Sequence, residues 1–132
     1  MSLNKGTLLS IPDESMNSFV WKEIRREYWT GGFKSTECRL DGYFRCPSSM
    51  MVDVWRWSDS DDKVSYTSWD WEKGQPDIQD EAKDRITINY DGKWNALSGD
   101  VERGLICSKK ASPGIFLISY VNYVLNINNH RT

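Results

Sequence analysis

The chain has few of the residues that build metal centres or nucleophiles. Its 132 residues include a single histidine, His130, and three cysteines, Cys38, Cys46 and Cys107, with no CxxC spacing among them. Structural zinc sites and Cys/His nucleophile pairs both draw on clusters of these two residue types. The sequence therefore supports neither kind of site. An odd number of cysteines also leaves at least one without a partner in this chain.

A surplus of one charge sign is missing as well. Lys and Arg number 17 and Asp and Glu number 19, so the net charge is -2, and no long run of one sign occurs. Proteins that bind nucleic acids carry a basic patch or stripe. We therefore expect no nucleic-acid partner.

Long hydrophobic runs are also absent. The first ten residues lack the charged and apolar regions of a secretory signal. The most apolar segment, residues 114–127, contains Asn122 and Asn126 and is shorter than the roughly 20 residues that a bilayer span requires. We expect this chain not to insert into a membrane, and the β-branched and aromatic content of the segment predicts a strand.

Aromatic residues, by contrast, are abundant. Seven Trp, six Tyr and four Phe occur in a chain whose length fits one small domain. Such a composition suits a small fold in which both the core and the exposed loops depend on large rings.

One helix is expected near the N-terminus. Leu8, Leu9 and Ile11 form a short strand candidate, and Pro12-Asp13-Glu14 is a helix-start signal. Apolar residues then recur at helical spacing until Gly31-Gly32 ends the pattern. The residues of this predicted stripe are Met16, Phe19, Val20, Ile24 and Tyr28.

Strands and turns follow the predicted helix. Asp41-Gly42 is a hairpin turn signal that Cys38 and Cys46 are close enough in sequence to bridge. Further strands are predicted at residues 52–57, in a hairpin of residues 85–95 around Asp91-Gly92, and at residues 104–108. Strands separated by loops after an early helix indicate an α+β arrangement.

Several short motifs occur in a fixed order along this pattern. Trp55-Arg56-Trp57-Ser58-Asp59-Ser60 is similar to a "W-x-W-S-D-G" step, Tyr66 to Trp69 to "Y-x-x-W", and Gly74-Gln75-Pro76 to "G-x-P". Trp94-Asn95 is similar to "W-N-D", with Ala96 in third place, and Ile106-Cys107 to a final "I-C". Together they resemble the C-type lectin-like domain, and in particular a repeat of a macrophage-mannose-receptor-type protein.

The resemblance implies a domain organisation. Residues 1–110 are expected to form an α+β C-type lectin-like domain, with small antiparallel sheets and a long loop region. The first strand and first helix of such a domain would precede residue 1. Residues 111–132 lie beyond the family's end and are expected to be an apolar C-terminal extension. This extension could replace the missing strand in the sheet, or it could be a non-native extension of a fragment.

The resemblance also implies a ligand site. Gln75, Asp77 and Asn95 match residues that hold calcium and a sugar in such domains, around a proline that is cis, and the Gln-Pro-Asp order goes with galactose-type ligands. Trp69 and Trp71 could stack on a sugar face. Two further calcium donors of the family fall at Ala96 and near Lys83, where Asp80 or Glu81 could substitute if the loop is shifted. Calcium needs about six to eight oxygens. We therefore expect calcium dependence to be weak or absent.

The family's disulfides are altered in this sequence. One cysteine pair of the family falls at about Arg85 and Gly99, so both of its ends are missing together. The family partner of Cys107 would lie before residue 1. Cys107 is then either a free, buried thiol or a partner of Cys38 or Cys46.

The leading function is a non-enzymatic recognition module that binds a glycan, a glycoprotein or another protein ligand. By resemblance it would be extracellular, or part of the ectodomain of a membrane receptor. The alternative is a non-binding structural fragment or splice product of a larger lectin-like receptor. An enzyme is not expected, because the loop carboxylates show no defensible acid/base spacing. These carboxylates are Asp59, Asp61, Asp62, Asp80, Glu81 and Asp84.

Overall fold

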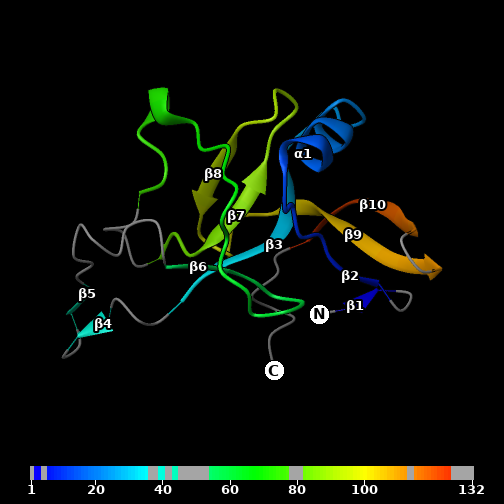
Figure 1. The fold of residues 1–132 in the computed structure, drawn as a ribbon. Coiled ribbons are helices and arrows are strands. Elements are labelled where there is room, and N and C mark those ends of the chain that lie inside the picture. The colour runs from blue at the N-terminus through cyan, green and yellow to red at the C-terminus, as the bar shows by residue number, and fades with distance from the viewer. Residues whose placement is uncertain are drawn as a thin grey trace.

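A computed structural model describes residues 2–3, 6–35, 39–40, 43–44, 54–77, 82–112 and 115–125. These residues form one α-helix, a 3₁₀ turn, an eight-stranded sheet and a separate two-stranded sheet (Figure 1). In chain order the elements are β1 Ser2–Leu3, β2 Gly6–Leu8, α1 Glu14–Trp21, β3 Tyr28–Lys34, β4 Arg39–Leu40, β5 Tyr43–Phe44, β6 Trp55–Trp57, η3 Trp71–Lys73, β7 Arg85–Ile88, β8 Trp94–Leu97, β9 Arg103–Ser112 and β10 Ile115–Leu125.

Strand β9 organises the large sheet. β2 pairs antiparallel with β9 at Cys107 and Ser108, and β3 pairs parallel with it at Gly104 and Leu105. β10 pairs antiparallel with β9 over most of the length of both strands. β3 in turn pairs with β6 and β7, and β7 pairs with β8. The sheet therefore joins both ends of the described chain to its middle.

The predicted helix exists but is shorter than expected. Asp13 caps α1 by accepting a hydrogen bond from the backbone N–H of Met16, which is a typical helix start. The helix ends at Trp21, and Gly31-Gly32 lies inside β3 instead of terminating a helix. Tyr28 belongs to β3, and the predicted stripe residue Phe19 is exposed. The expected continuation was wrong because pairing of β3 with three neighbouring strands overrides a helical spacing.

Both predicted hairpins are confirmed. β4 and β5 pair around residues 41–42, with Arg39 opposite Phe44 and Leu40 opposite Tyr43. Cys38 and Cys46, which are close enough in sequence to bridge this hairpin, lie outside the described residues. β7 and β8 pair around a turn in which Gly92 takes a φ of 82°, a conformation that favours glycine.

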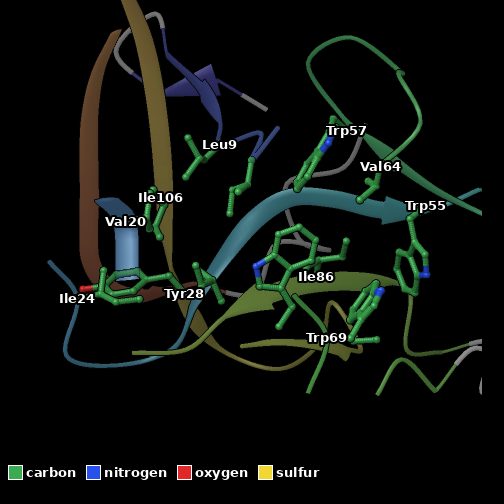
Figure 2. Packing of buried hydrophobic residues seen from close by; sticks show 14 of the residues in the cluster. Leu9, Val20, Ile24, Tyr28, Trp55, Trp57, Val64, Trp69, Ile86 and Ile106 are labelled. Carbon is green, nitrogen blue, oxygen red and sulfur yellow. The ribbon is translucent and has the colours of Figure 1, made fainter. Parts of the chain in front are cut away.

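The core is built mainly from rings. Trp94 is completely buried and meets the rings of Trp57, Tyr66 and Trp69 in edge-on contacts with centroids 5.7–5.8 Å apart. Trp55 packs against Trp69 from the other side. Figure 2 shows Trp55, Trp57 and Trp69 around β3, with Val20 and Ile24 of the same core near α1. The high tryptophan content is therefore used largely for packing.

The C-terminal segment is a strand, as predicted. Along β10, Ile118 and Tyr120 pack against the main core, while Leu117 on the alternate face is exposed. Among the described residues, no helix is long and apolar enough to cross a membrane.

Candidate functional site

The candidate site is held by a segment that runs along β8. Trp69 and Trp94 form a parallel bridge. The N–H of Asp70 donates to the carbonyl of Trp94 at 3.0 Å, and the N–H of Trp94 donates to the carbonyl of Ser68 at 2.7 Å. The chain then turns through η3 and Gly74, whose φ is 76°. These contacts fix the start of the loop while its tip extends away from the sheet (Figure 1).

The two candidate sugar-stacking tryptophans have opposite environments. Trp69 is 6% exposed and packs between Trp55 and Trp94, so its ring is part of the core. Trp71, in η3, is 69% exposed. Of this pair, Trp71 alone presents a ring to a ligand.

Gln75 lies against β8, next to a cis peptide bond. The Gln75-Pro76 bond is cis, as the resemblance implied. The Gln75 side-chain carbonyl accepts a hydrogen bond from the backbone N–H of Ala96 at 2.8 Å. This contact commits Oε1 to the strand backbone.

Asp77 is paired with a cation. Its Oδ2 lies 3.2 Å from the ammonium nitrogen of Lys83, and both side chains are partly exposed. The position at which the family places an acidic calcium ligand therefore holds a lysine in direct contact with Asp77. A fixed ammonium beside this carboxylate opposes binding of a second cation there.

Asn95 takes part in a different network, on the face of the sheet away from Trp94. Its side-chain nitrogen donates to Oε2 of Glu27 at 2.7 Å, and the Thr87 hydroxyl donates to the same oxygen at 2.7 Å. Arg103 donates from Nε to Oε1 of Glu27, also at 2.7 Å. Glu27 thus joins the chain before β3 to β7, β8 and β9.

The sequence did not single out Glu27 or Arg103. They are 76 residues apart. Glu27 precedes β3 and Arg103 opens β9, and the pairing of these two strands could not be read locally. The sequence offered one signal for this pair, a carboxylate and a guanidinium that each lie near the end of a strand. Many pairs of surface residues have the same property, so the signal does not distinguish Glu27 and Arg103.

The described residues do not fit a calcium site. Calcium requires about six to eight oxygen donors around one point. Gln75 is bonded to the strand backbone, Asp77 to Lys83 and the Asn95 amide to Glu27. Within the described part of the chain, no group of three His, Cys, Asp or Glu side chains could hold a metal ion. Asp80 and Glu81, two further candidate carboxylates, lie outside that part.

Cys107 is a free thiol in the core, one of the two states that the sequence left open. Burial raises the pKa of this thiol. Its neighbour across the sheet is Leu8 in β2, so the position serves strand packing.

Comparison with known proteins identifies the architecture. No protein-family profile and no curated protein matches the sequence. The mouse scavenger receptor C-type lectin carbohydrate-recognition domain superposes with a TM-score of 0.59 at 24% identity, over 81% of this chain and 74% of that domain. A calcium-independent type II antifreeze protein superposes with a TM-score of 0.51 at 16% identity, over 91% of this chain and 70% of that protein.

The chain has a C-type lectin-like fold. This confirms the predicted α+β class, and at such identities the likeness concerns the fold alone. Within the C-type lectin-like fold, the motifs found in the sequence fall on β6, the bridge at Trp69, the cis proline, β8 and β9. The finer assignment to a mannose-receptor-type repeat stays a prediction.

Proposed function

We propose that this chain is a non-enzymatic recognition module that binds a glycan, or a protein ligand, without calcium. The observation that carries the proposal is the Asp77–Lys83 ion pair, at 3.2 Å, together with the exposed ring of Trp71 earlier in the same segment. The ion pair occupies the carboxylate that calcium would need. The ring of Trp71 offers an aromatic surface to which a sugar can bind without a metal.

The binding surface that we propose consists of Trp71, Gln75 and Asp77. An indole ring packs against the apolar face of a sugar, and neighbouring amide and carboxylate groups can bond its hydroxyls. In this proposal Asn95 and Trp69 support the surface from behind, through the Glu27 network and the core respectively. Two proteins of the same fold, described above, support this proposal. One is a carbohydrate-recognition domain, which is consistent with glycan binding, and the other is calcium-independent, which is consistent with binding without calcium.

Residues 1–110 would carry this module, with β10 completing its sheet along β9. In the same proposal the module acts outside the cell or in the ectodomain of a receptor, where glycans and glycoproteins are available as partners.

A glycan array probed with and without calcium tests the proposal. We expect at least one ligand to bind equally in calcium and in chelator, and Trp71→Ala to reduce that binding by about tenfold or more, as loss of a stacking ring predicts. Phe19→Ala is the matched control, because Phe19 is also an exposed ring but lies on α1. Equal loss in both variants would contradict a site at Trp71.

Thermal melting provides the second arm. A ligand that binds only the folded state raises its stability, so a calcium site would raise the melting temperature in millimolar calcium. We expect no such rise. A calcium-dependent rise would overturn the metal-free part of the proposal, and a cooperative melt with no ligand on any array would favour a purely structural module.

A further inference from the structure

A pocket lies where the loop after α1 meets β10. It has a volume of about 350 Å³ and is lined by Glu23, Ile24, Arg25, Arg26, Tyr28 and Tyr120. This volume is within the range of small-molecule sites, roughly 300–1,000 Å³. None of the lining residues belongs to the Trp71 surface, so the pocket is a separate feature of the molecule.

One residue that lines the pocket carries an unsatisfied donor. The Tyr120 hydroxyl is buried and has no hydrogen-bond partner among the residues that the structure describes. Burial, the Glu23 carboxylate and Tyr28 raise the pKa of Tyr120, so the hydroxyl keeps its proton at neutral pH. Buried polar groups in native proteins are almost always bonded, and an exception calls for an absent water or ligand.

The rim of the pocket carries two guanidinium groups. Arg25 and Arg26 are exposed, and within the described chain neither forms an ion pair. Arg25 donates only to the adjacent carbonyl of Ile24, at 3.3 Å. Guanidinium groups match the planar oxygens of a carboxylate, often through two parallel hydrogen bonds.

The remaining lining residues define the rest of a ligand. Glu23 leaves the pocket with one net positive charge and supplies an acceptor for hydroxyl groups. Ile24 and Tyr28, shown next to each other in Figure 2, form an apolar wall, and the rings of Tyr28 and Tyr120 lie 5.9 Å apart. The matching ligand has one negative charge, several hydroxyls and one apolar face.

We propose that this pocket binds an acidic sugar, a sugar ring that carries a carboxylate. The carboxylate pairs with Arg25 and Arg26, one ring hydroxyl accepts from Tyr120, and another donates to Glu23. Such a site is independent of the calcium question and of the Trp71 surface.

A titration of the full chain with glucuronate, monitored by NMR, tests the site. Glucose is the matched control ligand, because it has the same ring without the carboxylate. We expect glucuronate to shift the Tyr120 and Ile24 signals saturably and glucose to leave them unchanged. Equal shifts with glucose, or no shift with glucuronate, would overturn the proposal.

Variants locate the contacts. R25Q/R26Q is expected to weaken glucuronate binding at least about tenfold, as loss of charged hydrogen bonds predicts, and Tyr120→Phe to weaken it severalfold. Lys63→Gln removes a positive charge from an exposed site on another loop and should bind like the unmodified chain. Unchanged melting temperatures show that the variants fold. An unchanged affinity in R25Q/R26Q would overturn the site.

Two further arms separate this site from other sources of signal. Inorganic sulfate tests for a general anion site, and sulfate binding as tight as that of glucuronate would overturn the assignment to a carboxylated sugar. Trp71→Ala should leave glucuronate binding unchanged. Loss of glucuronate binding in Trp71→Ala would place the sugar at the Trp71 surface and overturn the pocket as its site. If the glycan array instead shows no binding at the Trp71 surface, the glucuronate results for the pocket still stand.

Discussion

Tyr66 links the long loop to the first turn of α1. Its hydroxyl donates to Oε2 of Glu14, and its ring packs edge-on against Trp94. Burial is the main cause, and the contact with Glu14 the second, of a rise in the pKa of Tyr66 from 10.0 to about 12. Because the raised pKa favours the protonated phenol in the folded state, this contribution to stability is complete below pH 10 and is lost as the pH rises toward 12.

Tyr66→Phe should remove this pH dependence. Between pH 10 and 12 the unmodified chain is expected to lose more free energy of unfolding than the variant, because only the former has a phenol to ionise at this position. Urea unfolding at several pH values measures the difference. Tyr90→Phe is the control, since Tyr90 is 59% exposed. Parallel pH profiles for Tyr66→Phe and the unmodified chain would contradict a raised pKa at Tyr66.

At the scale of elements, Asn17 fastens α1 to the β7–β8 hairpin. Its side-chain oxygen accepts from Nε1 of Trp94 at 2.8 Å, and its side-chain nitrogen donates to the carbonyl of Gly92 at 3.0 Å. Asn17 is buried, so water does not replace these bonds if the side chain is removed. One buried amide therefore sets where the helix sits on the sheet.

Asn17→Ala should lower the free energy of unfolding by about 2 kcal/mol, because it leaves the buried indole N–H of Trp94 without an acceptor. The exposed neighbour Ser15→Ala is the control and should change little. In a Trp94→Phe background, which has no such N–H, Asn17→Ala should cost less. Urea unfolding of the four proteins of this cycle measures the coupling, and strictly additive costs would contradict it.

The elements also show which inferences local sequence supports. The hairpins around residues 41–42 and 91–92 were predictable, because turn dipeptides and alternation are local signals. Helix α1 was extended too far, because Ile24 and Tyr28 continue a helical spacing although they lie in a loop and in β3. The length of β3 is decided by strands up to about 80 residues away in sequence, including β9. No local pattern contains that information.

For the candidate site, too, some features could be predicted from the sequence and others could not. The resemblance located the cis bond at Gln75-Pro76 and the substitution at Lys83. It could not separate Trp69 from Trp71, since their burial depends on where Trp55 and Trp94 lie. It also placed Asn95 among calcium ligands, whereas Glu27, 68 residues away, takes its amide. Tertiary partners of this kind become visible only when the strands are paired.

At the scale of the whole molecule, β10 makes the C-terminal segment part of the sheet. It pairs with β9 from Ser112 to Arg103, on the edge that β2 and β3 do not use. Without it, β9 would present an open edge, which invites pairing with other chains. The same strand brings Tyr120 to the loop after α1 and so contributes to the pocket that we propose for an acidic sugar.

If β10 belongs to the same cooperative unit as the core, its two faces should differ in their sensitivity to truncation. Ile118→Ala should cost about 1–2 kcal/mol, since this partly buried side chain packs on the main core, while Leu117→Ala, next to it but 54% exposed, should cost little. Urea unfolding monitored by tryptophan fluorescence reports mainly on the core, because most of the indole rings are buried there. Because the rings around Trp94 lie in that core, a shift of the fluorescence midpoint by Ile118→Ala requires β10 and the sheet to unfold together. Equal midpoints for the two variants would mean that β10 detaches before the domain unfolds.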